Sequence, residues 1–144
     1  MKKLIFIFIA ISFLLFSEEN VVFLIDENYP PYSYLEGEKI KGIYPDILSI
    51  VDKNLKEFKI ILKPVPWNRA LKMIELGQAD YITDVWYRPN DRPYLNYSVP
   101  IIDEEIVIVS KNGDGKKWPN DFKGKIIGIN RGFAVFSSEE KLAK

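Results

Sequence analysis

The chain contains no histidine and no cysteine. Without these side chains it cannot build a Ser-His or Cys-His nucleophile pair, nor a metal site with imidazole or thiolate ligands. The absence of cysteine also excludes a lipid attached to a processed cysteine. It is compatible with an oxidising compartment, because a domain with an adequate core does not need disulfides. Only a carboxylate mechanism would remain for catalysis, and we predict no enzyme activity, no cofactor and no metal.

The chain also lacks an excess of charge of either sign. It has 20 basic and 20 acidic side chains, and loss of Lys2 and Lys3 with a leader would leave two more acids than bases. Lysine and glutamate alternate along the sequence and form no basic stripe of the kind that binds nucleic acid, so we expect no nucleic-acid partner. No internal repeat or low-complexity tract is present, and a hydrophobic content of 47% supports a packed core.

The first hydrophobic run is too short for a comfortable membrane span. Lys2 and Lys3 precede an apolar segment from Leu4 to Phe16, whereas a span needs about 20 residues. A charged start followed by a short apolar segment is typical of a secretory signal. We therefore predict a signal peptide over residues 1–17, cleaved near Ser17, and export to the periplasm. An uncleaved membrane anchor and a buried N-terminal helix are the alternatives.

The residues after the leader alternate between strand and helix patterns. Val21–Ile25, Phe58–Pro64 and Ala79–Val85 are predicted strands, separated by two segments with helical spacing. Pro45 suits the first turn of the first helix, where its missing donor costs nothing, and Gly77 can end the second in a left-handed cap. This order predicts an α/β fold with right-handed crossovers and a mainly parallel sheet. The residues at helical spacing are Ile43, Ile47, Ile50, Val51 and Leu55, then Ala70, Leu71, Ile74 and Leu76.

The pattern changes beyond Arg92. Two further strands are predicted, over Glu105–Ser110 and Lys125–Asn130. Ser137 with Glu140 can form a capping box for a final helix. The last predicted strand and the start of this helix have no other elements to pair with. They therefore resemble the beginning of a second domain.

Polar and aromatic residues gather in the loops that follow the first three predicted strands. In an open parallel sheet, small ligands bind at the carboxyl ends of the strands. Arginine supplies a planar donor fork for a ligand carboxylate, and aromatic faces hold a cation or a planar group. Such loops suit a small zwitterion. The loop residues are Asp26, Tyr29, Tyr32 and Tyr34, then Trp67 and Arg69, then Asp84, Tyr87, Arg88 and Arg92.

Each of these residues also has a structural alternative. Arg92 could form a surface ion pair, and Trp67 could pack at the start of a helix. Tyr29 could shield the edge of the sheet, and Asp26 could cap a backbone turn. A structural role is harder to assign to Asp84, because a carboxylate that closes a strand is costly unless it is solvated or paired.

Seven motifs, in this order along the chain, carry a resemblance to a known family. They are Asp26–Tyr34, Gly42–Ile47 (Gly-Ile-Tyr-Pro-Asp-Ile), Trp67 at a helix start, Gly77–Asp80, Arg92, Tyr97–Pro100, and Phe122–Lys125 leading into Gly128–Phe133. The span from about Val21 to Val135 resembles the start of a bacterial periplasmic solute-binding protein of the polar amino acid type, family 3, the receptor component of ABC importers. This resemblance implies the type II periplasmic-binding fold, in which two lobes close around the ligand.

The resemblance also implies roles for individual residues. Arg92, twelve positions after Asp80, would hold a ligand carboxylate. Tyr29 and Trp67 would clamp the ligand from two sides, and Asp26 would meet a basic group. The chain departs from the family where small hydroxyl residues are usual, and these departures favour a larger, cationic or aromatic solute over an ordinary α-amino acid. The candidate ligand-binding residues are Asp26, Tyr29, Trp67, Asp84, Tyr87, Arg92, Arg131 and Phe133.

The resemblance predicts an exported protein that captures an amino acid or similar small polar solute for ABC-type import. Its partners would be the solute and an ABC permease in the inner membrane, and we expect a monomer. A ligand-sensing module of a membrane signalling protein and a non-functional fragment are the alternatives. The family needs about 220 residues to close two lobes. We therefore expect a first lobe over residues 18–101, an incomplete second lobe over 102–144, and weak binding or none by this C-terminally truncated chain alone.

Overall fold

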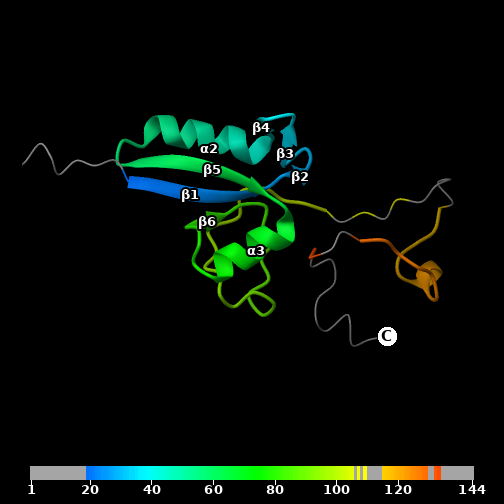
Figure 1. Cartoon of the computed structure of the whole chain (residues 1–144). Coiled ribbons are helices and arrows are strands. Elements are labelled where there is room, and N and C mark those ends of the chain that lie inside the picture. The colour runs from blue at the N-terminus through cyan, green and yellow to red at the C-terminus, as the bar shows by residue number, and fades with distance from the viewer. Residues whose placement is uncertain (1–18, 106, 108, 110–114, 130–131, 134–144) are drawn as a thin grey trace, which may run out of the picture. The chain divides into compact units, whose positions relative to one another are not determined.

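The chain folds into two units. The structure, a computed structural model, describes residues 19–105, 107, 109, 115–129 and 132–133. One unit extends to Val85, and the other begins at Trp86 (Figure 1). The lobe boundary expected at residues 101 and 102 stays a prediction.

The larger sheet of the first unit has three parallel strands in the order β5-β1-β6. Strand β1 spans Glu19–Asp26, β5 spans Phe58–Val65 and β6 spans Tyr81–Ile82. The three predicted strands and their parallel arrangement are confirmed. Strand β6 is shorter than predicted at both ends; it cannot continue through Asp84, which adopts a left-handed backbone conformation with φ of 62°.

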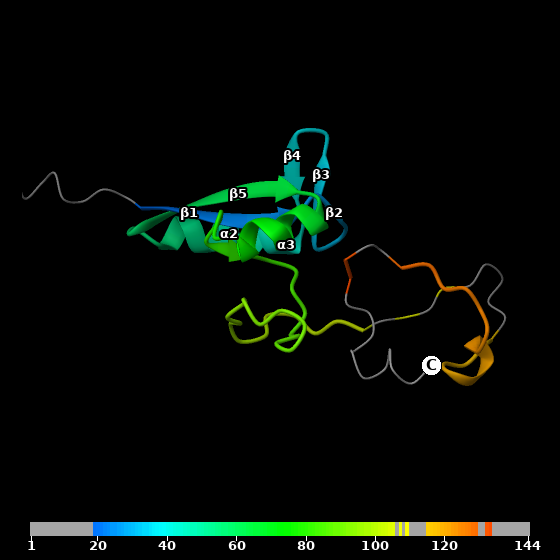
Figure 2. The ribbon, with the colours of Figure 1, turned by 60° about the horizontal axis from the view of Figure 1, so that its bottom comes forward.

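The two predicted helices are confirmed, and they cover opposite faces of this sheet. Helix α2 spans Ile43–Asn54 between β1 and β5, and α3 spans Trp67–Glu75 between β5 and β6. Figure 1 shows them on either side of the β1–β5 pair, and Figure 2 shows the same elements with α3 turned toward the viewer. The chain moves outward from β1 to β5 and then back across β1 to β6, so two right-handed crossovers place their helices on opposite faces. Leu24 and Ile25, which point to opposite faces, are accordingly both 0% exposed.

The main core lies between α3 and the sheet. Buried side chains of β1, β5 and α3 meet there, and partly buried aliphatic residues surround them. The end of α3 is defined by Gly77, whose φ is 66°. Its N–H donates to the carbonyl of Ile74 at 3.1 Å, and that of Gln78 donates to Met73 at 2.9 Å. These two bonds form the Schellman motif, so the predicted left-handed cap is confirmed. The buried members of the core are Leu24, Val65, Ala70 and Met73.

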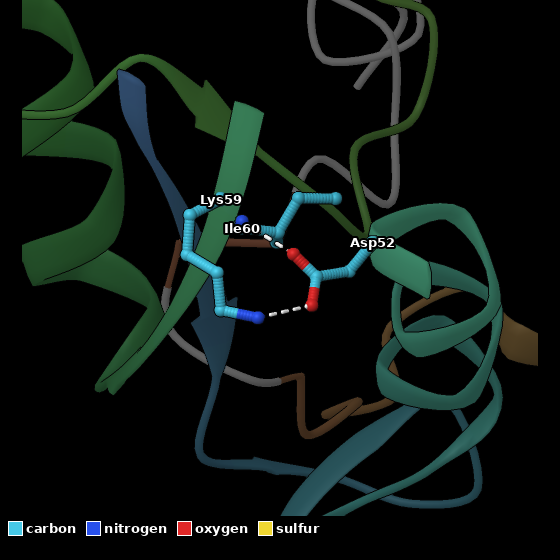
Figure 3. Close-up of polar contacts among 3 residues, drawn as sticks. All are labelled: Asp52, Lys59 and Ile60. Carbon is cyan, nitrogen blue, oxygen red and sulfur yellow. Dashed lines mark hydrogen bonds and ion pairs between the residues drawn. The ribbon is translucent and has the colours of Figure 1, made fainter. Parts of the chain in front are cut away.

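Helix α2 buries less of its apolar surface than its sequence suggests. Pro45 and Leu48 are its buried residues, whereas four of the residues at helical spacing are exposed. Its last turn is attached to β5 by Asp52, whose Oδ1 accepts the Ile60 N–H at 2.7 Å and whose Oδ2 accepts the Lys59 ammonium at 2.5 Å (Figure 3). The bond from Lys59, followed by that from Ile60, holds the pKa of Asp52 below its ordinary value. The exposed residues are Ile43, Ile50, Val51 and Leu55.

A small antiparallel sheet follows β1 where the sequence predicted only a loop. Its strands are β2 (Asn28–Tyr29), β3 (Ser33–Glu36) and β4 (Lys39–Lys41), in the order β2-β3-β4. Gly37, with φ of 63°, makes the turn between β3 and β4. The prediction missed this sheet because strands of two to four residues beside two prolines show no clear alternation.

The second unit contains one short 3₁₀ helix, η1 (Asn120–Phe122), among its described residues. Residues 125–129 form no strand there, so the strand predicted over Lys125–Asn130 is wrong for these residues. The physical reason is that a strand needs a neighbour to satisfy its backbone groups, and no described segment pairs with this one. The strand predicted over Glu105–Ser110 lies partly outside the described residues. The predicted signal peptide and final helix lie wholly outside them.

No helix in the described part of the chain is long and apolar enough to span a membrane.

Candidate functional site

Two acidic side chains lie at the carboxyl ends of neighbouring strands. Asp26 is the last residue of β1, and Asp84 lies two residues beyond β6. The register pairs Leu24 with Ile82, which brings both acids to the same edge of the sheet. Asp26 is 6% exposed and Asp84 is 7% exposed. The topology therefore collects two buried carboxyl groups where ligands of open parallel sheets bind.

Ser33 connects these two acidic residues. Its side chain is completely buried, and its Oγ lies 2.9 Å from the main-chain oxygen of Asp26 and 2.5 Å from Oδ2 of Asp84. Thr83 adds a second hydroxyl, with Oγ1 at 3.0 Å from the same Asp84 oxygen and 3.4 Å from the carbonyl of Leu24. Because Ser33 begins β3, it joins the small sheet to the end of the large one.

Asp84 combines several features that are unusual for a purely structural residue. Burial raises its pKa to about 6, and the charge of Asp26 acts in the same direction. Hydrogen bonds that Ser33, Thr83 and the Asp26 backbone donate to an ionised carboxylate would lower it. Its Oδ1 is buried and has no hydrogen-bond partner among the described residues. Its left-handed backbone costs on the order of 1 kcal/mol or more for a non-glycine residue. Strain and a shifted pKa at a strand end together mark a candidate functional residue.

Asp26 has a structural role in addition to any role in binding. Its Oδ1 accepts the Asn28 N–H at 3.0 Å and so starts the turn into β2. Burial raises the pKa of this carboxyl, and the backbone N–H groups of Asn28 and Glu27 act in the opposite direction. The turn-capping alternative is therefore observed, and the predicted contact with a ligand stays a prediction.

Three tyrosines cluster in the turn between β2 and β3 and at the start of α2. The ring centroids of Tyr29 and Tyr32 are 4.9 Å apart, and those of Tyr32 and Tyr44 are 6.4 Å apart. The first N–H groups of a helix have no acceptor within the helix. In α2 they bind the turn: Ile43 donates to the carbonyl of Pro31 at 3.1 Å, and Tyr44 donates to that of Tyr32 at 3.0 Å. The turn and the helix start thus form one hydrogen-bonded aromatic unit.

Gly42 allows this close approach. Its φ is 127°, and a Cβ at this position would lie 2.3 Å from the carbonyl oxygen of Tyr32. No other residue fits so near a neighbouring backbone. The aromatic turn therefore requires glycine at position 42, the first residue of the Gly42–Ile47 motif.

Trp67 is the first residue of α3 and follows the carboxyl end of β5. It is 8% exposed, so most of its side chain is buried, as the structural alternative expected. Only a small part of the ring is left as a face for a ligand. Its predicted role as one side of a clamp stays a prediction.

The remaining candidates belong to the second unit. Tyr87 is 73% exposed, whereas Arg92 is 6% exposed and is therefore not a surface residue. Its Nη2 donates to the carbonyl of Gly132 at 3.4 Å. Phe133 is half-buried, and Arg131 lies outside the described residues.

The structure thus brings Asp26 and Asp84 together through Ser33, a residue that the sequence did not identify. No sequence signal could have found it, because its partners are 7 and 51 positions away. The described residues contain no group of histidine, cysteine, aspartate and glutamate side chains that could hold a metal ion.

Comparison with known proteins identifies one family. The model of the bacterial extracellular solute-binding proteins, family 3, matches residues 21–144. A comparison with curated proteins gave no match. The matched region includes every candidate ligand-binding residue from Asp26 to Phe133.

Proposed function

Because the chain belongs to the bacterial extracellular solute-binding proteins of family 3, we propose that it captures a small polar solute in the periplasm and delivers it to an ABC permease of the inner membrane. Membership of this family supports an extracytoplasmic solute-binding role and the type II periplasmic-binding fold. A binding protein needs a shaped site and no reactive nucleophile, in agreement with a chain that contains neither histidine nor cysteine.

The observation that carries the proposal is the collection of chemical groups at the carboxyl ends of β1, β5 and β6. The aromatic turn, Trp67 and the acids Asp26 and Asp84 all follow these three strands. Aromatic faces attract cations by roughly 0.5–2 kcal/mol for each ring contact, and an ionised Asp26 would add a negative charge. We therefore propose an amino acid or similar solute that carries a positive group.

Arg92 is the proposed partner of a solute carboxylate. A guanidinium can donate two parallel hydrogen bonds to a carboxylate. Arg92 is largely buried, and a planar guanidinium suits this task better than the ammonium of a lysine.

Calorimetry on the purified protein with a panel of the twenty amino acids and common polyamines tests the proposal. We expect heat of binding with at least one amino acid that has a cationic side chain, and none with neutral sugars. The Arg92→Ala variant should lose this binding, because the carboxylate loses its bidentate donor. The exposed acid Asp46 supplies a control, since Asp46→Asn should bind as the unmodified protein does.

Two results would contradict the proposal in different ways. Absence of binding for the whole panel at millimolar concentration, measured on the full-length protein, would remove the solute-capture function. Unchanged affinity in Arg92→Ala would retain that function and transfer the carboxylate contact to Arg88 or Arg69.

A further inference from the structure

Three oxygen atoms lie in a row where the two sheets of the first unit meet. Oδ2 of Asp84 is 2.5 Å from Oγ of Ser33, and this Oγ is 2.9 Å from the main-chain oxygen of Asp26. Both distances are those of hydrogen bonds, and each bond needs one proton. The serine hydroxyl has one proton, and a carbonyl oxygen can only accept. A neutral Asp84 carries a proton that supplies the second bond of this row.

The direction of each bond follows from this count. Ser33 donates to the carbonyl of Asp26, and the protonated carboxyl of Asp84 donates to Ser33. A separation of 2.5 Å suits an O–H···O bond in either direction, and only the direction from Asp84 to Ser33 leaves the Ser33 proton for the carbonyl of Asp26. An ionised Asp84 would take the Ser33 proton and leave two oxygen atoms 2.9 Å apart with no proton between them.

The surroundings of Asp84 also favour the neutral acid. Its Oδ1 is buried without a donor among the described residues, which is far more costly for a charged oxygen than for the carbonyl of a neutral acid. The charge that acts on it is that of Asp26 on β1, which opposes a second negative charge, and its other neighbours Ser33 and Thr83 are uncharged. Burial raises the pKa of Asp84 to about 6, so the proton is exchanged in the mildly acidic range.

The same bonds determine the position of the aromatic turn. Ser33 directly follows Tyr32 and pairs with Tyr29 in the small sheet. The hydrogen bonds of Ser33 to Asp26 and Asp84 therefore also position Tyr29 and Tyr32 at the end of the large sheet. When Ser33 donates to an ionised Asp84, the turn loses its bond to β1.

We propose that Asp84, as a neutral carboxylic acid, holds the Tyr29–Tyr32 turn against the ends of β1 and β6 through Ser33, and that its ionisation loosens this turn. Asp84 is then a positioning residue for the aromatic face of the site. The consequence for solute capture, weaker binding at higher pH, rests on the proposed function.

A titration of the Asp84 carboxyl carbon by NMR tests the direction of the bond. In the unmodified protein we expect a transition near pH 6. In Ser33→Ala we expect the pKa of Asp84 to fall, because the acid loses the group that accepts its proton. A rise would mean that Ser33 donates to an ionised carboxylate, and an unchanged value would mean that the two groups are not coupled; either result overturns the proposal. Thr83→Val is the matched control: the Thr83 hydroxyl lies 3.0 Å from the same carboxyl oxygen, and loss of a bond that it donates to the ionised carboxylate should raise the pKa.

Amide hydrogen exchange tests the effect on the turn and does not require Ser33→Ala to fold. The N–H groups of Tyr32, Leu35 and Tyr44 are all bonded in or around the turn. After correction for intrinsic rates, we expect their protection to fall about tenfold between pH 5 and 7.5. In Asp84→Asn protection should stay constant, because the amide donates to Ser33 at every pH and asparagine tolerates the left-handed backbone.

The same pH profile in both proteins, or no change in the unmodified one, would overturn the proposal. Both experiments use the protein without a solute. A full-length protein that binds no member of the solute panel would therefore remove the proposed function and leave this test of Asp84 intact.

Discussion

The two units of the chain contain similar aliphatic residues but bury them to different extents. Leu24 in the first unit is 0% exposed, whereas Ile126 in the second is 102% exposed. Val99, Val107 and Val109 are likewise mostly exposed. In the first unit, paired strands and two helices bring apolar faces together, and the described part of the second unit has no paired strands. Hydrophobic composition alone therefore does not produce a core.

The candidate ligand-binding residues are divided in the same way. Asp26, Tyr29, Trp67 and Asp84 belong to the unit with the paired sheet, and Tyr87, Arg92 and Phe133 belong to the other. We expect substitutions in the first unit to change its free energy of unfolding and matched substitutions in the second to leave it unchanged. Fluorescence of Trp67 reports the first unit alone when the two tryptophans of the second, Trp86 and Trp118, are replaced by phenylalanine.

The largest effect is expected for Leu24→Ala. Removing a fully buried leucine side chain leaves a cavity against α3 and should lower the free energy of unfolding by about 2–5 kcal/mol. Ile126→Ala, in the second unit, should change it by less than about 0.5 kcal/mol, because this side chain is fully exposed. Urea unfolding followed by Trp67 fluorescence measures both. If the two substitutions lowered the free energy of unfolding equally, Ile126 would have to be buried, and the two units would not differ in burial.

The pH dependence of stability should be concentrated in the first unit. Burial raises the pKa of Asp84 from 3.8 to about 6 on folding, so the folded state binds this proton more tightly. Its contribution is complete below pH 3.8 and is lost as the pH rises through about 6, a change of at most about 3 kcal/mol at 1.36 kcal/mol per pKa unit.

Urea unfolding between pH 4 and 7.5 measures this dependence. Asp84→Asn should flatten the profile. Burial raises the pKa of Asp26 as well, so Asp26 adds a slope of the same sign to both proteins. The difference between the two profiles therefore belongs to Asp84, and parallel profiles would exclude a proton shift at this residue.

Gly77→Ala should have a smaller effect. The Cβ would meet no atom within 4 Å, so the cost comes from the left-handed backbone at φ of 66° alone, about 1 kcal/mol. Gly124 offers the matched position in the second unit, with φ of 72° and equally open space. Gly124→Ala should leave the unfolding of the first unit unchanged, and a loss similar to that of Gly77→Ala would show that the units unfold together.

The smallest effect is expected for Asp52→Asn. The asparagine oxygen can still accept the Ile60 N–H, and only the exposed ion pair with Lys59 is lost. The fall in melting temperature should therefore be smaller than for Gly77→Ala, and salt should reduce the difference. Because the pKa of Asp52 is lowered, its contribution is present at neutral pH and is lost as the pH falls below 3.8. Asp103→Asn, in the second unit, is the control, and a larger fall for the control would contradict this order.

The features that the sequence predicted well are those with a local cause. Apolar runs of strand length predicted β1 and β5, and helical spacing with Pro45 predicted α2. Gly77 predicted the end of α3, because the left-handed cap depends on a single residue. The small sheet of β2, β3 and β4 was missed, because its strands are too short to show a period. The sequence also did not predict that apolar residues of α2 are exposed, because helical spacing predicts a helix but not the element that packs against it.

The sequence by itself determined the order of strands and helices, the parallel sheet and the family, because these depend on periodicity and on motifs that are contiguous in the chain. Only the tertiary structure decided that Ser33 lies between Asp26 and Asp84, and that Asp84 is buried with one oxygen unpaired. The physical reason is distance along the chain. These contacts join residues 7 and 51 positions apart, and they form only when parallel pairing of β1 and β6 aligns the two strand ends.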